Sequence, residues 1–132
     1  MRPRRPDQAW RDRGSAIVEF VLVAPLLVAV AVAVLEFALV LHVRATLTAA
    51  AADGARAASL AGADPASGVR RARLLLADNL AGSVVRTVTA GRVVLEGRAV
   101  MVVRIEAGLP FAGLLGPAVL AVEGHSLREG WS

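Results

Sequence analysis

The chain of 132 residues contains no cysteine, no lysine and no tyrosine, and it has only two histidines. Without cysteine, no disulfide can stabilise a domain outside the cytoplasm, so its stability must come from packing or from partners. All fifteen basic residues are arginine, and aromatic residues make up 4% of the chain. Because aromatics are scarce and no basic run continues into a groove-binding helix, we predict that the protein has no nucleic-acid partner.

The chain is instead rich in apolar residues, which make up 56% of it, with a mean hydropathy of +0.60. This is too apolar for an ordinary soluble domain of this size. Between positions 20 and 41 the only charged residue is Glu36. Because about 20 predominantly apolar residues span a bilayer, we predict one transmembrane helix over residues 15–43.

Arginines crowd the start of the chain, before the apolar run. They stand at positions 2, 4, 5, 11 and 13, whereas only Arg44 and Arg56 occur in the next comparable stretch beyond the run. The positive-inside rule places such an N-terminus in the cytoplasm. We therefore expect a cytoplasmic basic leader over residues 1–14 and an extracytoplasmic domain over residues 44–132, with the protein in the cell membrane.

Two simpler interpretations of the apolar run stay open. A secretory signal peptide would be cut near small residues such as Ala29-Val30-Ala31, but this run is longer than the roughly 7 to 15 residues of a signal-peptide core. A signal anchor that is never processed fits the hydropathy equally, because hydropathy does not report a peptidase site.

One carboxylate stands just before the apolar run and one lies inside it, near its end. Glu19 and Glu36 are seventeen residues apart, or about 26 Å in a helix, which approaches the roughly 30 Å thickness of the hydrocarbon core. A carboxylate there costs about 2.5 to 3.5 kcal/mol, so Glu19 needs a partner, and an amine created by cutting after Gly14 would serve. Glu36 either reaches the headgroups or contacts a partner helix. Pro25 removes one helical hydrogen bond and is expected to loosen the helix.

Beyond the apolar run, an alanine-rich segment is expected to continue the same helix outward as far as Gly62. Ala50, Gly54, Ala58 and Gly62 recur at every fourth position and form a face of small residues. Such a face either lets another helix approach closely or is covered by the protein's own domain. Asp53 and Arg56, three positions apart, are expected to form a solvated ion pair.

A second, amphipathic helix is predicted from Asp64-Pro65 to about Leu80, with a stop at Gly82. Its apolar face contains Val69, Ala72, Leu75, Leu76 and Leu80, and its polar face contains Arg70, Arg71, Arg73 and Asp78. The period then changes to two. We expect three antiparallel strands with turns at Ala90-Gly91 and Glu96-Gly97, then a Gly- and Pro-rich loop whose apolar residues cover the sheet or dock a partner, and a last strand over residues 119–127. The predicted fold class is therefore α+β, a long N-terminal transmembrane helix extended by an amphipathic helix packed on a small antiparallel sheet.

Little in the sequence indicates catalysis. Gly124-His125-Ser126-Leu127-Arg128 begins like a nucleophile elbow, but arginine replaces the closing glycine and a following helix is missing. His42 and His125 are not spaced as metal ligands, and no phosphate-binding glycine loop precedes a helix. We predict no enzymatic activity, no catalytic residues, no metal and no cofactor.

The chain resembles the TadE-like pseudopilins of tight-adherence pilus systems. The residues that carry the resemblance are Arg13-Gly14-Ser15-Ala16-Ile17-Val18-Glu19-Phe20, Ala24-Pro25-Leu26-Leu27, Leu35-Glu36-Phe37 and Asp53-Gly54-Ala55-Arg56-Ala57-Ala58, and they are specific only over the first sixty positions. The resemblance implies a type IV pilin-like fold. It also implies that a prepilin peptidase cuts between Gly14 and Ser15.

The resemblance further implies how such a subunit assembles. Glu19, Phe20 and Glu36 would pair helices, and Ala50, Gly54 and Ala58 would pack them. The expected partners are the peptidase, other pilin-like subunits, pilus platform proteins and membrane lipid, and the expected function is that of a minor pilin-like subunit in pilus assembly, adhesion and secretion. The alternative is an unprocessed membrane-anchored adaptor that binds a cell-envelope partner. A major filament subunit is disfavoured, because such subunits are much shorter.

Overall fold

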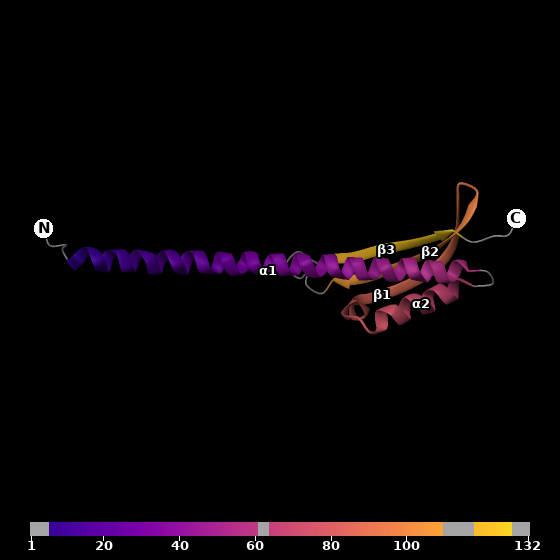
Figure 1. The fold of residues 1–132 in the computed structure, drawn as a ribbon, viewed down its shortest axis with the longest axis horizontal. Coiled ribbons are helices and arrows are strands. Elements are labelled where there is room, and N and C mark those ends of the chain that lie inside the picture. Colours follow the sequence, from indigo (N-terminus) through magenta and orange to yellow (C-terminus); the bar gives the residue numbers. More distant parts are fainter. Residues whose placement is uncertain (1–5, 61–63, 110–117, 128–132) are drawn as a thin grey trace. The chain divides into compact units, whose positions relative to one another are not determined.

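The computed structural model describes residues 6–60, 64–109 and 118–127, with the side chains of residues 6–13, 80 and 81 left aside. It divides into two compact units, residues 1–38 and 39–132. Helix α1 (Pro6–Ser59) runs through both (Figure 1). Alanine and leucine supply its helical propensity, and Pro25 lies inside it without ending it.

The second unit is an α+β domain, as predicted. Its elements after α1 are α2 (Pro65–Ala77), a short 3₁₀ helix η1 (Leu80–Val84), β1 (Val85–Leu95), β2 (Arg98–Leu109) and β3 (Ala118–Leu127). The strands form one antiparallel sheet in the order β1-β2-β3. The C-terminal part of α1 and all of α2 lie along this sheet (Figure 1).

The core of this unit lies between the helices and one face of the sheet. Leu47, Met101, Val103 and Ile105 are its largest fully buried side chains. Alternate residues of β2 face the core, as expected for a strand with one face packed and one solvated. Burying apolar surface at about 25 cal/mol per Å² is thus the main force that holds the helices on the sheet.

Helix α2 begins where the sequence predicted. Asp64 is its N-cap, with its Oδ1 accepting a hydrogen bond from the Ser67 N–H at 2.8 Å, and Pro65 opens the first turn. Its end differs from the prediction. The helix ends at Ala77. The side-chain amide of Asn79 donates a hydrogen bond from its Nδ2 to the Leu75 carbonyl oxygen at 2.7 Å, which gives a carbonyl of the last turn a partner. Gly82, the predicted stop, lies within η1.

The sheet has three strands among the described residues, one fewer than predicted, because no turn forms at Ala90-Gly91. Strand β1 continues through both residues, which pair with Val103 and Val102 of the long strand β2. The turn forms instead at the other predicted position. Glu96 and Gly97 both have positive φ, 52° and 77°, as a two-residue hairpin turn requires. Gly108 and Leu109, predicted to begin the apolar loop, are instead the last residues of β2, where they pair with Val119 and Ala118, and Leu109 packs against the core. The other apolar residues of the predicted loop, Phe111, Leu114 and Leu115, lie outside the described residues, as does Gly62.

Candidate functional site in the N-terminal helix

The predicted processing site lies within helical backbone. Gly14 and Ser15 are part of α1, which begins upstream at Pro6, and both are exposed. A Cβ added at Gly14 would meet nothing within 4 Å. The bond between Gly14 and Ser15 is therefore sterically open, although a helical peptide must unwind locally before an extended-substrate peptidase can cut it.

Glu19 stands one helical turn after Ser15, on a part of α1 whose described side chains are almost all exposed. Phe20, next to it, is 71% exposed. No hydrogen bond or ion pair joins Glu19 or Glu36 to any side chain that the structure describes. Both glutamates lie in the first unit, seventeen residues apart, which corresponds to about 26 Å of helix rise.

The surface between the two glutamates is almost entirely apolar. The candidate span covers Gly14–Ser59; its most apolar 18-residue window has a mean hydropathy of 2.8, and none of that window is buried. By length and composition this helix could cross a membrane, and within the described residues no other helix could. An exposed apolar surface of this extent needs lipid or protein around it.

Glu19 and Glu36 are the two charged side chains on this apolar part of the helix, and their state depends on what surrounds them. A carboxylate on an apolar helix becomes acceptable in lipid only if it is protonated, reaches the headgroups or meets a cation. Within the described side chains no cation lies beside Glu19 or Glu36, so any such cation must come from elsewhere.

The small-residue face lies on the buried side of α1, inside the second unit. Ala50 and Ala58 are buried, and a Cβ added at Gly54 would lie 2.8 Å from the Gly68 carbonyl oxygen. A Cβ at Gly68 would in turn lie 2.8 Å from the Gly54 carbonyl oxygen and 2.9 Å from the Ala58 Cβ. The two helix backbones thus touch through paired glycines. This contact lies within the domain and covers Gly54 and Ala58.

Polar contacts tie α1 to the rest of the second unit. Asp53 Oδ2 accepts hydrogen bonds from Arg71 Nε and Nη2 of α2 at 3.2 and 3.1 Å. The predicted pair with Arg56 is therefore wrong, because the close approach of α2 brings Arg71 within reach of Asp53. The Ser59 hydroxyl, which is buried, hydrogen-bonds the Ser126 hydroxyl of β3 at 2.9 Å and donates to the Arg56 carbonyl at 2.8 Å.

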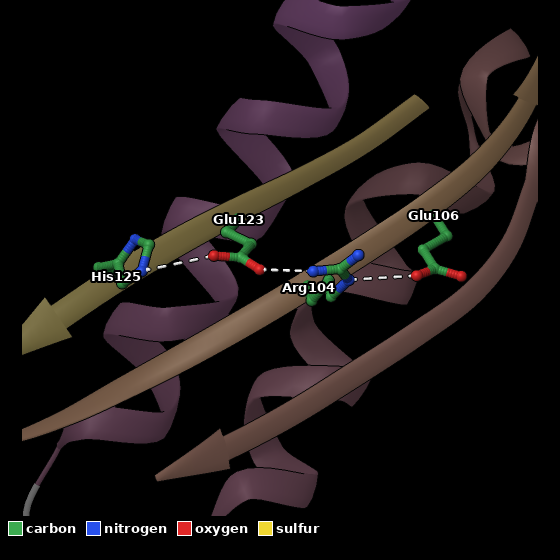
Figure 2. A network of polar contacts seen from close by, with 4 residues as sticks. All are labelled: Arg104, Glu106, Glu123 and His125. Atoms are coloured by element: carbon green, nitrogen blue, oxygen red, sulfur yellow. Dashed lines mark hydrogen bonds and ion pairs between the residues drawn. The ribbon is translucent and has the colours of Figure 1, made fainter. Parts of the chain in front are cut away.

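The outer face of the sheet carries a polar network centred on Arg104 of β2 (Figure 2). Its Nη1 is 2.8 Å from Glu123 Oε1, and its Nε is 3.1 Å from Glu106 Oε1. His125 Nε2 lies 3.7 Å from Glu123 Oε2. The hydrogen bonds that Arg104 donates to the carboxylates of Glu106 and Glu123 raise the pKa of Arg104 above its usual value. The guanidinium is therefore charged at neutral pH, and this half-exposed network contributes little to stability.

The residues of the predicted nucleophile-elbow look-alike are separated by the sheet. His125 is exposed on the outer face, whereas Ser126 faces α1 and is held by Ser59. The two side chains therefore point away from each other. No group of three metal-ligating side chains occurs within the described part of the chain. The absence of catalysis stays a prediction.

Sequence reasoning missed Gly68, the partner of Gly54. The signal was present, since a glycine inside an amphipathic helix costs about 1 kcal/mol relative to alanine and so usually has a packing reason. It also missed Ser59 and Arg71, whose partners lie 67 and 18 positions away in the chain. No local pattern reports contacts at such separations.

Comparison of the sequence with known proteins gave one match, to a protein family. Residues 14–56 match the family model described as TadE-like protein. The match begins at Gly14, contains both glutamates, and ends among the small residues that pack on α2. The resemblance seen in the sequence is thus confirmed over this part of α1, which we call the TadE-like segment because it is similar to that family. No curated protein and no solved structure was found to match the chain.

Proposed function

We propose that the protein is a minor pilin-like subunit, a pseudopilin, of a tight-adherence pilus system. One observation carries the proposal. Glu19 has no partner among the described side chains, stands on an exposed apolar helix at the fifth position after the Gly14–Ser15 bond, and falls within the TadE-like match over residues 14–56.

In this proposal a prepilin peptidase cuts after Gly14. Glycine at that position weakens the helix by about 1 kcal/mol relative to alanine, which favours the local unwinding that cleavage needs. The new ammonium group on Ser15 then meets Glu19, either in the same chain or in a neighbouring subunit. That ion pair offsets the cost of placing a carboxylate in lipid and sets the axial register between adjacent helices.

We further propose that the arginine-rich N-terminus lies in the cytoplasm and that the α+β domain lies outside the membrane. Other pilin-like subunits and pilus platform proteins would then contact the exposed face of the N-terminal helix beside Phe20 and Glu36. Membrane lipid would cover the remaining apolar surface of that helix before assembly. The protein would serve adhesion and secretion without catalysing a reaction.

The first experiment is N-terminal sequencing of the protein recovered from its native membrane. A start at Ser15 would support prepilin-type processing. A start at Met1 would contradict it and favour the unprocessed adaptor. A start beyond Ala31 would show that the helix had served as a secretory signal.

The second experiment tests the role of the carboxylate. We expect Glu19→Leu to abolish piliation while the protein stays in the membrane, because the helix becomes more apolar but loses its ion pair. Glu19→Asp, which keeps the charge, is the matched control and should retain piliation in part. Normal piliation in Glu19→Leu would contradict the pairing mechanism and leave the adaptor as the better proposal.

A further inference from the structure

The hairpin that joins β1 and β2 extends beyond the third strand of the sheet (Figure 1). Strand β3 ends at Leu127, which pairs with Val100. The last two pairs of the hairpin, Leu95 with Arg98 and Val94 with Ala99, lie past that point. The tip of the hairpin is therefore a two-stranded ribbon without the cover of a third described strand.

The free edge of this ribbon is apolar. Val93, Val94 and Leu95 are 44%, 68% and 48% exposed. β1 is an edge strand in the sheet order, so beyond its pairing with β2 its other side presents backbone N–H and C=O groups. Proteins usually protect such an edge with proline, lysine or a bulge. The register shift in β1 lies between Val85 and Thr87, at the far end of the strand, so this bulge does not protect the apolar edge, and residues 93–95 contain neither proline nor lysine.

We propose that the edge at residues 92–96 docks a second copy of the chain, by antiparallel pairing of the two β1 strands centred on Val94. In this register Val94 lies opposite Val94 of the second copy, and Val93 lies opposite Leu95. At each end of the paired segment, Arg92 of one copy comes near Glu96 of the other, the exposed residue that follows β1 and begins the turn. Both flanking positions thus join opposite charges, and the three central positions join apolar side chains.

The symmetry of the charge pattern favours a second copy over an unrelated strand. A two-fold contact requires a self-complementary patch, and the sequence Arg92-Val93-Val94-Leu95-Glu96 provides one. Arg98 does not oppose the contact. The two Arg98 residues would be separated by three strand spacings, about 14 Å, which exceeds the roughly 8 Å Debye length at physiological ionic strength. Because the segment is short, the contact is reversible.

Crosslinking of the full chain in detergent micelles tests the proposal, because the natural sequence has no cysteine. Under mild oxidation Val94→Cys should form a disulfide-linked dimer, since the two residues lie opposite each other. Leu74→Cys is the matched control, with 67% exposure of the original side chain against 68% for Val94. Equal crosslinking of the two variants would overturn the proposal.

Charge variants in the Val94→Cys background test the register. Arg92→Glu and Glu96→Arg each place like charges opposite each other at both flanks, and each should lower the crosslinked fraction about fivefold. A mixture of these two differently tagged variants restores opposite charges and should crosslink as hetero-dimers. If each variant crosslinks with itself as well as the parent does, or if the mixture stays uncrosslinked, the proposed contact is wrong. Neither result depends on pilus function, since no pilus component is present.

Discussion

At the scale of single residues, close packing in the second unit depends on the absence of a side chain at specific positions. Gly54 and Gly68 let two helices touch, and Gly124 of β3 lies directly against the backbone of Ala51 in α1. Interiors are packed as densely as organic crystals, so even one added carbon at such a contact forces the backbone to move. The backbone of α1 thus packs directly against the backbone of β3 at this position.

Gly124→Ala is therefore expected to destabilise the second unit, by about 1 to 3 kcal/mol, as overpacking does. The added Cβ would fall on the Ala51 carbonyl group. Denaturant unfolding of the full chain in detergent, followed by circular dichroism, measures the change.

Gly91→Ala is the matched control for that measurement. Gly91 lies in β1 and its added Cβ would meet nothing within 4 Å. We expect its unfolding free energy to change by less than about 0.5 kcal/mol, as for ordinary surface substitutions. Equal losses in both variants would contradict the close approach of α1 to β3.

We expect the stability that Arg104 contributes through the outer-face network to be the same at neutral and at mildly alkaline pH. Its pKa is raised in the folded state. A cation with a raised pKa contributes its full stabilisation below its unfolded pKa and loses it only as the pH rises through the folded pKa, here far above neutrality. Arg104→Gln should therefore lower the thermal midpoint slightly and by the same amount at pH 7 and pH 9. A difference between the two pH values would contradict the assigned cause.

At the scale of elements, α2 is defined at both ends by side-chain hydrogen bonds to its own backbone. Asp64 caps its start, and Asn79 satisfies a carbonyl of its last turn. These bonds matter because a helix of 13 residues is too short to be stable alone. Packing on α1 and the sheet provides the remaining stabilisation.

We expect Asp64→Ala to cost about 1 kcal/mol of unfolding free energy, the usual loss when an N-cap is removed. Asp78→Ala, at the opposite end of α2, provides a control of opposite sign. It removes a negative charge from the helix C-terminus and should stabilise by a few tenths of a kcal/mol. Thermal unfolding of the two variants checks the difference, and equal shifts would show that Asp64 is not a cap.

At the scale of the whole molecule, the two units place their apolar residues differently. The second unit buries them between helices and sheet, whereas the first exposes its large apolar side chains over residues 14–38. A surface of the second kind is stable only in lipid or against another protein. The membrane, or an assembly of helices, is therefore the environment that this helix requires.

The double variant Val30→Arg/Val32→Arg should weaken membrane attachment. Each arginine near the middle of a spanning helix costs about 2.5 to 3.5 kcal/mol on insertion scales. We expect most of the variant to leave the membrane fraction after an alkaline wash, as read by immunoblot. Leu74→Arg, at a position 67% exposed in α2, should stay attached. Release of neither variant would mean that another segment anchors the chain.

The TadE-like segment, the apolar helix and the α+β class were accessible from the sequence, because each depends on composition or on a period of 2 or 3.6 residues. The start of α2 and the turn at Glu96-Gly97 were also predicted, since capping and turn chemistry act over four residues. The processing site and the pairing of Glu19 stay predictions, because they concern partners outside the chain.

Only the tertiary structure decided which residues meet across long distances. It placed Arg71 beside Asp53, Ser126 beside Ser59, and Gly68 against Gly54. It also showed that β1 runs unbroken through Gly91, since pairing with the long strand β2 outweighs the local preference for a turn. The sequence by itself determined where apolar surface and charge lie along each element. Which of those surfaces are covered depends on packing between segments distant in the chain, and no local pattern encodes that.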